Sequence, residues 1–318
     1  MAKRSAPKIP TYKRRRKGNP VLRAIGWVVR IVLALIVLSL LWVLAYRFIN
    51  PPVTPNMIGD MIASRGAHKD WMPITQIDRD MVRAAIGAED GKFCSHHGFD
   101  WDAIQDAAKR NASGGRIRGG STISQQTAKN AFLWNGGGYA RKGAEAWFTF
   151  LIEHMWGKRR IMEVYLNLAE TGIGTYGVNA GSQRYFGHDA SAMTATEAAR
   201  LAAVFPLPKK RGAIAPKGFT RRYGNTIAAR IGEVSRDGLD ACVYQGITAP
   251  AKKAPPKVTT KPRPLPGEEY ETAKPAERAQ EPAVENSPVP TEPTNTIEAQ
   301  PPATLPPESL AQTPTNAY

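Results

Sequence analysis

The stretch MVRAAIGAEDGKFCSHHG, residues 81–98, joins an apolar helix to a crowded polar turn. Met81, Ala85 and Ala88 recur at helical spacing before a glycine interrupts the pattern. Glu89 therefore comes at the end of a packed helix, where its carboxylate can project into a cleft. Burial at such a place raises the pKa of a carboxyl and suits it to take up a proton. Taken alone, however, a glutamate at a helix end is more often a solvated surface charge.

The two histidines of the same turn raise the alternative of a metal site. His96 and His97 are adjacent, so they cannot both point at one metal ion from a helix or strand without distortion. No HxxxH or CxxC pattern lies nearby. Zinc is therefore the less favoured interpretation of this stretch.

Upstream, an uninterrupted apolar run at 31–46 is long enough, once extended back to residue 24, to cross a bilayer. We predict a transmembrane signal-anchor helix over 24–46, with Arg30 snorkelling toward the headgroups. The basic tail 1–23 before it predicts a cytoplasmic N-terminus. A signal peptide cleaved after Val43-Leu44-Ala45 is the alternative, disfavoured by the length of the basic and apolar segments.

The rest of the chain divides into a linker, a helical domain and a tail. Residues 47–60 form the linker, since the prolines of PPVTP stiffen it. From 61 to 247 the apolar residues recur at helical spacing, and we find no alternating strand pattern. We therefore predict a mainly α fold for this domain. Residues 248–318 are rich in proline without a hydrophobic period, which predicts a disordered tail.

Two local signals mark where helices begin inside the domain. Asp100 is a natural N-cap for a helix that follows it. Thr194-Ala-Thr-Glu197 reads as a capping box, and the helix that it opens should end before Pro206.

The net charge and the number of cysteines limit the partners and the disulfides that the chain can have. Much of the net charge of +16 lies in the N-terminal tail, and the remainder would face away from the cytoplasm. We therefore exclude nucleic acid as a partner and favour an anionic lipid surface or a phosphate-bearing substrate. Cys94 and Cys242 are too few for a disulfide framework, although they allow one bridge.

The segment GGSTISQQTAKN, 119–130, predicts a helix with one polar face. If Ser121 caps this helix, one side of it carries a hydroxyl, two amides and an ammonium. These groups belong to Thr122, Gln125, Gln126 and Lys129. Such a set suits a polar ligand that bears sugar hydroxyls and phosphate.

Three further blocks have an ordinary explanation when each is taken singly. RKGAEAWFTFLIE, 141–153, places Arg141 and Glu145 one helical turn apart, as in a surface ion pair. KRRIMEVYLN, 158–167, carries an apolar stripe that fits core packing. GVNAGSQRYFG, 177–187, fits a helix that ends at its last glycine.

In this order and at these intervals, the five blocks resemble the motifs of the peptidoglycan glycosyltransferases, which polymerise the glycan strands of the bacterial cell wall from lipid II. EDGKFCSHHG matches that family's E-D-x-x-F-x-x-H-x-G, and GGSTISQQTAKN its G-x-S-T-I-x-Q-Q-x-x-K-N. RKGAE matches R-K-x-x-E, and KRRIMEVYLN matches K-x-x-I-L-E-x-Y-L-N. The resemblance runs from about Asp80 to Pro208, with small departures at Ser124 and Met162.

Some members of this family also carry a transpeptidase domain, which needs a Ser-x-x-Lys nucleophile motif and a Lys-Thr-Gly-like strand. Here the one Ser-x-x-Lys is SAPK at 5–8, within the predicted cytoplasmic tail, and neither Lys-Thr-Gly nor Lys-Ser-Gly occurs. The chain therefore resembles the monofunctional members, which have no transpeptidase activity.

The resemblance implies a lysozyme-like helical glycosyltransferase domain behind the membrane helix. It implies lipid II and a growing glycan on undecaprenyl diphosphate as substrates, joined with inversion at MurNAc C1. It further implies a single-pass protein of the bacterial inner membrane with a periplasmic catalytic domain. Membrane lipids, and cell-division or cell-wall synthesis proteins, are the other expected partners.

The resemblance also assigns roles to residues. Glu89 would be the general base, and Glu145 would assist at the diphosphate side, where it could hold a divalent cation, Mg²⁺ or Mn²⁺; no covalent cofactor is expected. The residues expected to contact sugar or phosphate are Ser121, Thr122, Gln125, Gln126, Lys129, Asn130 and Arg141. The residues expected to shape the site are Asp90, Phe93, His96, Gly98 and Glu163.

Three points stay open from the sequence. Phe132, Leu133 and Trp134 fit either the bilayer surface or the protein core. A glycan-cleaving lytic transglycosylase also uses a glutamate in a related helical fold, but it has no need of a basic diphosphate site. A non-catalytic scaffold for cell-wall assembly fits the anchor and the tail but not the intact motifs.

Overall fold

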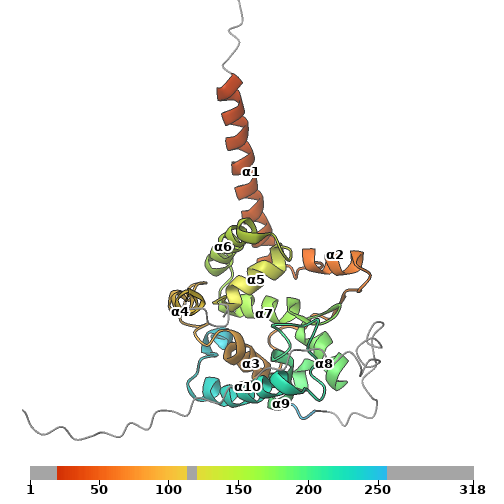
Figure 1. The fold of residues 1–318 in the computed structure, drawn as a ribbon. Coiled ribbons are helices and arrows are strands. Elements are labelled where there is room, and N and C mark those ends of the chain that lie inside the picture. Colours follow the sequence, from red (N-terminus) through yellow and green to blue (C-terminus); the bar gives the residue numbers. More distant parts are fainter. Residues whose placement is uncertain (1–19, 113–119, 256–318) are drawn as a thin grey trace, which may run out of the picture. The chain divides into compact units, whose positions relative to one another are not determined.

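The computed structural model describes residues 20–112 and 120–255 and is mainly helical, as predicted (Figure 1). The N-terminal half contains α1 (Pro20–Phe48), α2 (Pro55–Ile62), α3 (Arg79–Glu89), α4 (Trp101–Ala112), α5 (Ile123–Phe132) and α6 (Gly138–Met155). The C-terminal half contains α7 (Lys158–Leu168), α8 (Val178–Phe186), α9 (Ala195–Ala202), α10 (Gly218–Arg236), α11 (Ala241–Tyr244) and the 3₁₀ turn η1 (Ala190–Ala192).

Helix α1 is long and apolar enough to cross a membrane, and most of its large apolar side chains are exposed. It extends the predicted span 24–46 by a few residues at each end. Its C-terminal part contacts the domain: Trp147 donates a hydrogen bond of 3.0 Å to the hydroxyl of Ser39, and Trp156 one of 2.8 Å to the carbonyl of Val43. Only the last four residues of the predicted basic tail 1–23 lie within the described part of the chain.

Helix α2 occupies the end of the segment that the sequence assigns to a linker. Thr54 caps this helix by accepting a hydrogen bond from the backbone N–H of Met57, and Pro55 fits its first turn because a proline there sacrifices no intrahelical bond. Met57 and Asp60 are buried, so the domain begins before residue 61. Of the three prolines that suggested a spacer, Pro51 and Pro52 precede the helix and Pro55 starts it.

Three short strands, β1 (His68–Lys69), β2 (Glu170–Gly172) and β3 (Thr175–Tyr176), form a sheet in the order β1-β3-β2. β1 runs parallel to β3, whereas β2 and β3 form an antiparallel hairpin. The sequence analysis found no strands because two or three residues are too few to show an alternating pattern.

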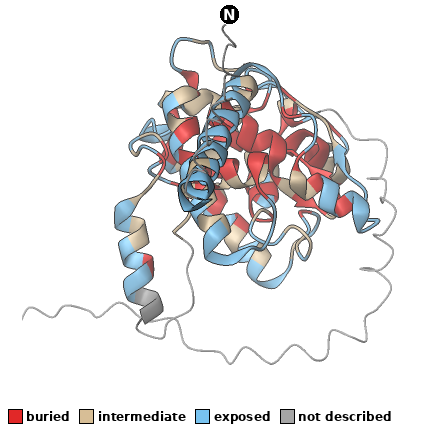
Figure 2. Ribbon diagram, turned by 90° about the horizontal axis from the view of Figure 1, so that it is seen from above, coloured by how far each residue is buried: buried red, intermediate tan, exposed pale blue. Residues whose placement is uncertain are grey.

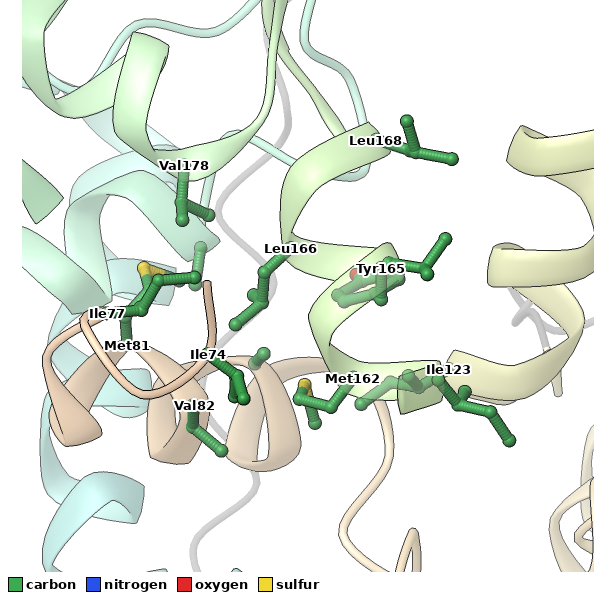
Figure 3. Close-up of a cluster of buried hydrophobic side chains, with 14 of the residues drawn as sticks. Ile74, Ile77, Met81, Val82, Ile123, Met162, Tyr165, Leu166, Leu168 and Val178 are labelled. Atoms are coloured by element: carbon green, nitrogen blue, oxygen red, sulfur yellow. The ribbon is translucent and has the colours of Figure 1, made fainter. Parts of the chain in front are cut away.

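The hydrophobic core surrounds α7, whose side chains Ile161, Met162, Tyr165 and Leu166 are almost completely buried. Figure 3 shows that side chains from α3, α5 and α8 meet those of α7. α5 packs against α6 and α7, while α10 packs against α3 and α9. Figure 2 shows the buried residues gathered inside the domain.

Two of the predicted helix starts are confirmed. The Asp100 carboxylate accepts a 3.0 Å hydrogen bond from the N–H of Ala103 in α4. Thr194 and Glu197 form the capping box of α9, with both reciprocal hydrogen bonds present. α9 ends at Ala202, four residues before Pro206.

A disulfide joins Cys94, in the loop between α3 and α4, to Cys242 in α11. The two cysteines are 148 residues apart in the sequence, so the bond closes a large loop of the chain. Closing a loop of this size removes conformational freedom from the unfolded chain and stabilises the fold. The bridge that the sequence left open thus ties the turn after Glu89 to the C-terminal end of the domain.

The described chain continues past the predicted start of the tail at residue 248. Lys252 forms ion pairs of 2.9 Å with Asp78 and 2.7 Å with Asp80, at the N-terminus of α3. The first residues after 248 therefore belong to the folded domain. The remainder of the predicted tail lies outside the described residues.

Candidate active site

Glu89 is the last residue of α3, where the N-cap Asp78 and a run of buried apolar side chains fix the helix. Its Oε2 accepts a 2.8 Å hydrogen bond from Nε2 of Gln126 in α5. Its Oε1 is buried and has no hydrogen-bond partner among the described residues. Burial raises the pKa of Glu89, an effect that Gln126, Lys129 and other groups only partly offset. The carboxyl is thus poised to accept a proton, as the sequence suggested.

The next residue, Asp90, holds the turn in place rather than facing a ligand. Its carboxylate accepts hydrogen bonds of 2.9 Å from the N–H of Ile123 and 2.9 Å from Nε2 of His96. The N–H of Gly98 donates to the other ring nitrogen of His96, which assigns the proton of the neutral ring to Nε2. Asp90 and His96 therefore connect the turn to the N-terminus of α5.

Gly98 and Phe93 complete this packing. Gly98 has φ +92°, and a Cβ there would lie 2.9 Å from the Thr149 side chain and 3.0 Å from that of Glu153. Phe93 is fully buried, and the ammonium of Lys158 lies 4.7 Å from the centre of its ring. Both residues occupy the supporting positions that the motif predicts.

The start of α5 differs from the sequence prediction. Thr122, not Ser121, is the N-cap, and it forms a capping box with Gln125. The Thr122 hydroxyl accepts from the N–H of Gln125 and donates to the carbonyl of Gly98, while the Gln125 amide accepts from the N–H of Thr122. Both side chains are buried. In this geometry they cap the helix, and a role of Thr122 and Gln125 in binding substrate stays a prediction.

Three polar residues of α5 line a cavity of about 320 Å³, and one of them, Gln126, is hydrogen-bonded to Glu89. Gln126, Lys129 and Asn130 form one wall. Tyr165 and Glu170 form part of another, and each contributes a buried oxygen that has no hydrogen-bond partner among the described residues. The cavity is thus lined by amide and cationic side chains that suit a polar ligand.

Lys129 carries the positive charge nearest to Glu89 on α5. Burial lowers the pKa of its ammonium, an effect opposed by the nearby carboxylates Glu145 and Glu89. Among the residues that the structure describes, none accepts a hydrogen bond from its Nζ. A bound anion would supply the acceptors that this buried ammonium requires.

Glu145 is buried in α6, and each of its two carboxylate oxygens contacts a cationic side chain. One oxygen accepts a 2.6 Å hydrogen bond from Arg141, and the other pairs with Lys142, which also donates a 3.2 Å hydrogen bond to Ser121. Glu145 therefore fixes a pair of cations beside Lys129, whose pKa it influences. The surface ion pair considered from the sequence is in fact a buried network.

The described residues around Glu145 do not fit a divalent cation. Such ions prefer several oxygen ligands, and both carboxylate oxygens of Glu145 already contact cationic side chains. Within residues 20–112 and 120–255 no cluster of three acidic, histidine or cysteine side chains has metal-binding geometry. We therefore derive no step through a metal ion.

Glu163 supports the domain on the other side of α7. Its Oε2 accepts a 3.0 Å hydrogen bond from the N–H of Ile74, and its Oε1 pairs with Arg160. Arg160 in turn donates to the carbonyl of Tyr46 at the end of α1. Glu163 thus connects α7 to the end of α1 and to the segment that follows it.

Several residues of the site escaped the sequence analysis. Glu153 accepts hydrogen bonds from Ser124 and from Lys158, which join α5, α6 and α7. Lys209 lines the cavity from the loop after α9. Lys142 could have been found from its position three residues before Glu145, whereas Glu153 and Lys209 reach the site only through tertiary packing.

The apolar segment after α5 divides between the two roles left open by the sequence. Phe132 and Leu133 are buried, and the Phe132 ring stacks on Phe148 of α6 with centroids 4.5 Å apart. Trp134 is 53% exposed, so it alone of the three remains available to the bilayer surface.

Comparison with known proteins agrees with these features. Residues 56–231 match the family model described as Transglycosylase. A biosynthetic peptidoglycan transglycosylase of Caulobacter vibrioides is 53% identical over 201 residues, which cover 63% of this chain and 88% of that protein. Proteins of the same name from Rhodospirillum centenum and Bdellovibrio bacteriovorus are 47% and 45% identical over 212 and 215 residues. These matches cover 66% and 64% of this chain and 91% and 86% of the relatives.

The segment that matches the family model, residues 56–231, contains Glu89, the cavity and the cationic network around Glu145. The alignments to the relatives separately cover most of the length of each relative. The family match thus includes the helical region that carries the candidate site, and this chain belongs to the transglycosylase family.

Proposed function

We propose that the protein polymerises lipid II into glycan strands and releases undecaprenyl diphosphate. The observation that carries this proposal is the hydrogen bond between Glu89 and Gln126, which lines a cavity that also contains Lys129, Lys209 and Lys210. A carboxyl whose pKa is raised by burial can accept a proton, and the cations can stabilise a diphosphate leaving group. The names of the relatives support peptidoglycan as the product.

In the proposed reaction, the 4-hydroxyl of the GlcNAc of lipid II attacks C1 of the MurNAc at the end of the growing glycan. Glu89 accepts the hydroxyl proton on Oε1, the oxygen without a hydrogen-bond partner among the described residues. The bond from C1 to the diphosphate oxygen breaks as the new bond forms on the opposite face, which inverts C1. The diphosphate leaves with the bonding electron pair, and its charge increases near Lys129.

Each side chain of the site has a distinct part in this scheme. Gln126 orients Glu89 through the 2.8 Å hydrogen bond and leaves Oε1 available. Lys129 binds the leaving diphosphate, since its buried ammonium needs an acceptor. Glu145 acts through the cations that it holds, Arg141 and Lys142. Ser121 and Asn130 remain candidate contacts for sugar or phosphate.

The membrane helix supports a location at the bacterial inner membrane, with the domain in the periplasm. Lipid-linked substrates would then reach the site from the bilayer that holds α1. The basic residues before α1 favour a cytoplasmic N-terminus. The disulfide favours an oxidising compartment for the domain. Cleavage near Ala45 would remove Ser39 and Val43, which contact α6 and the following turn, so the structure favours an uncleaved anchor.

The decisive experiment incubates the detergent-solubilised full chain with labelled lipid II. Polymer that a muramidase degrades is the expected product. Cleavage of preformed glycan without polymerisation would instead support a lytic enzyme, and no turnover of either substrate would support a scaffold. The Glu89→Gln variant serves as the control for traces of contaminating polymerase.

A further inference from the structure

Glu170 occupies a wall of the same cavity but plays no part in the reaction as proposed. It begins β2 and pairs across the sheet with Tyr176 of β3. Its Oε1 is buried without a hydrogen-bond partner among the described residues, and the nearest cation, Nζ of Lys209, lies 3.6 Å away. That separation is too long for a hydrogen bond. Glu170 thus lines the cavity with a carboxyl that has one buried, unsatisfied oxygen.

The charged groups around Glu170 are already committed to one another. Asp60 of α2 pairs with Lys209 at 2.7 Å and with Arg65 at 2.6 Å. Its other oxygen accepts a 2.7 Å hydrogen bond from the hydroxyl of Tyr176. Lys69, across the sheet in β1, donates instead to the carbonyls of Pro51 and Pro52. Lys209 and Arg65 therefore make their closest ion pairs with Asp60 and not with Glu170. The cost of burying the Glu170 carboxylate is only weakly offset.

The carboxyl of Glu170 can therefore gain or lose its proton near neutral pH. Burial raises the pKa of Glu170 to about 7; Lys209 opposes this rise, whereas the charge of Asp60 adds to it. Below that pH the carboxyl is neutral and can donate a hydrogen bond into the cavity. Above it, the carboxylate repels an anionic ligand and competes with that ligand for Lys209.

We propose that Glu170 and Lys209 form an oxyanion subsite for a phosphate ester, in which neutral Glu170 donates a hydrogen bond and Lys209 supplies positive charge. Lys210 lines the same end of the cavity and adds to the positive potential. A phosphate oxygen would supply the acceptor that the Glu170 hydroxyl lacks. Lys129, which lies on α5, lines the same cavity but is not one of the residues of this subsite.

Only the identity of the ligand depends on the proposed function. If the chain polymerises lipid II, the phosphate ester is the diphosphate of a lipid-linked substrate. The same chemistry would also fit the phosphodiester of a phospholipid headgroup. The two sources differ in their number of phosphates, and this difference can be measured.

The test measures binding of P1,P2-dimethyl diphosphate to the full chain in detergent by calorimetry between pH 5.5 and 8.5. This probe keeps its two charges throughout that range. If only the neutral carboxyl permits binding, affinity should fall about 30-fold from pH 5.5 to 8.5, since a pKa near 7 leaves roughly 3% of the carboxyl neutral at the upper limit. Binding near pH 7.5 should also take up a fraction of a proton, visible as a dependence of the heat on the buffer.

Three variants make the measurement specific. Glu170→Gln keeps a hydrogen-bond donor without the charge, so it should bind with little pH dependence and without proton uptake. Lys209→Met should bind more weakly at every pH. Glu233→Gln removes an exposed acidic charge from α10 and should behave like the wild type. A wild-type affinity that does not change with pH, or the same slope in Glu170→Gln, would overturn the proposal.

A second titration with glycerophosphoglycerol separates the two sources. A clear preference for the diphosphate would assign the subsite to the lipid-linked substrate, and an equal or higher affinity for the single phosphodiester would assign it to a lipid headgroup. Because binding is measured without turnover, pH-dependent binding in a chain that makes no polymer would contradict only the proposed function. Polymerisation together with pH-independent binding would contradict only the subsite.

Discussion

Replacing Glu89 by glutamine should inactivate the protein and at the same time stabilise it. Glutamine keeps the shape of the side chain and its acceptor for Gln126, but it cannot accept the proton of an attacking hydroxyl. Loss of a general base lowers a rate by about 10²–10⁴-fold. Polymerisation of labelled lipid II by the purified variant measures this loss.

The stability gain follows from the burial of the Glu89 charge. Burial raises the pKa of this carboxyl, and each unit by which folding raises a pKa costs the charged form about 1.4 kcal/mol. Glutamine carries no charge, so we expect Glu89→Gln to gain about 1–2 kcal/mol near pH 8, which corresponds to a rise in Tm of about 2–8 °C for a domain of this size. Loss of catalysis with gain in stability is typical of active-site charges.

The direction of the pKa shift determines how the stability difference between Glu89→Gln and the wild type changes with pH. Because folding raises the pKa of Glu89, the wild-type protein loses stability as pH rises through the pKa of the folded state. The advantage of Glu89→Gln should therefore be largest near pH 8. It should disappear at acidic pH, where the wild-type carboxyl is neutral as well.

Asp90→Asn is the matched control, since Asp90 is the adjacent carboxylate and is satisfied by Ile123 and His96. It should lower stability, by about 1–3 kcal/mol. The reasoning fails if Glu89→Gln retains most of the wild-type rate. It also fails if Glu89→Gln melts below the wild type at pH 8.

Three other substitutions test the roles of particular side chains. Thr122→Ala should lower the stability of the domain by about 1–2 kcal/mol through loss of the cap of α5; a loss of substrate affinity at unchanged Tm would show that Thr122 binds substrate instead. Lys129→Ala should weaken the binding of diphosphate analogues more than it changes Tm, and the reverse order would make this lysine structural. Replacing Cys94 and Cys242 together by serine should cost about 2–4 kcal/mol; reductant should lower the Tm of the wild type but not that of the variant, and equal sensitivity of the two proteins would contradict the role of the bridge.

The helices and the position of Glu89 were predictable because they depend on local patterns. The apolar spacing before Glu89 and the capping box at Thr194 are read directly from neighbouring residues. The first turn of α5 was predictable in principle, since Thr122-Ile-Ser-Gln125 is itself a capping-box sequence. The prediction placed the cap one residue too early because serine and threonine both suit that position.

Other parts of the site could not be predicted because they depend on tertiary packing. Lys209 and Glu170 are 39 residues apart, and the fold brings them to one end of the cavity. Whether a hydroxyl or amide faces a ligand or caps a helix also depends on the neighbouring chain. Gly98, for example, accepts the hydrogen bond that turns Thr122 inward.

The disulfide has a consequence for the biogenesis of the protein. Cys94 follows Glu89 by five residues, but its partner Cys242 lies near the end of the folded domain. In the proposed topology, the domain crosses the membrane with Cys94 first, so this cysteine remains a free thiol until almost the whole domain has been exported. The turn that follows Glu89, the proposed general base, can be covalently fixed only then. Partly exported chains, already anchored at the site of cell-wall synthesis, would therefore lack a locked active site, and the oxidation machinery of the periplasm would complete the enzyme in its last step.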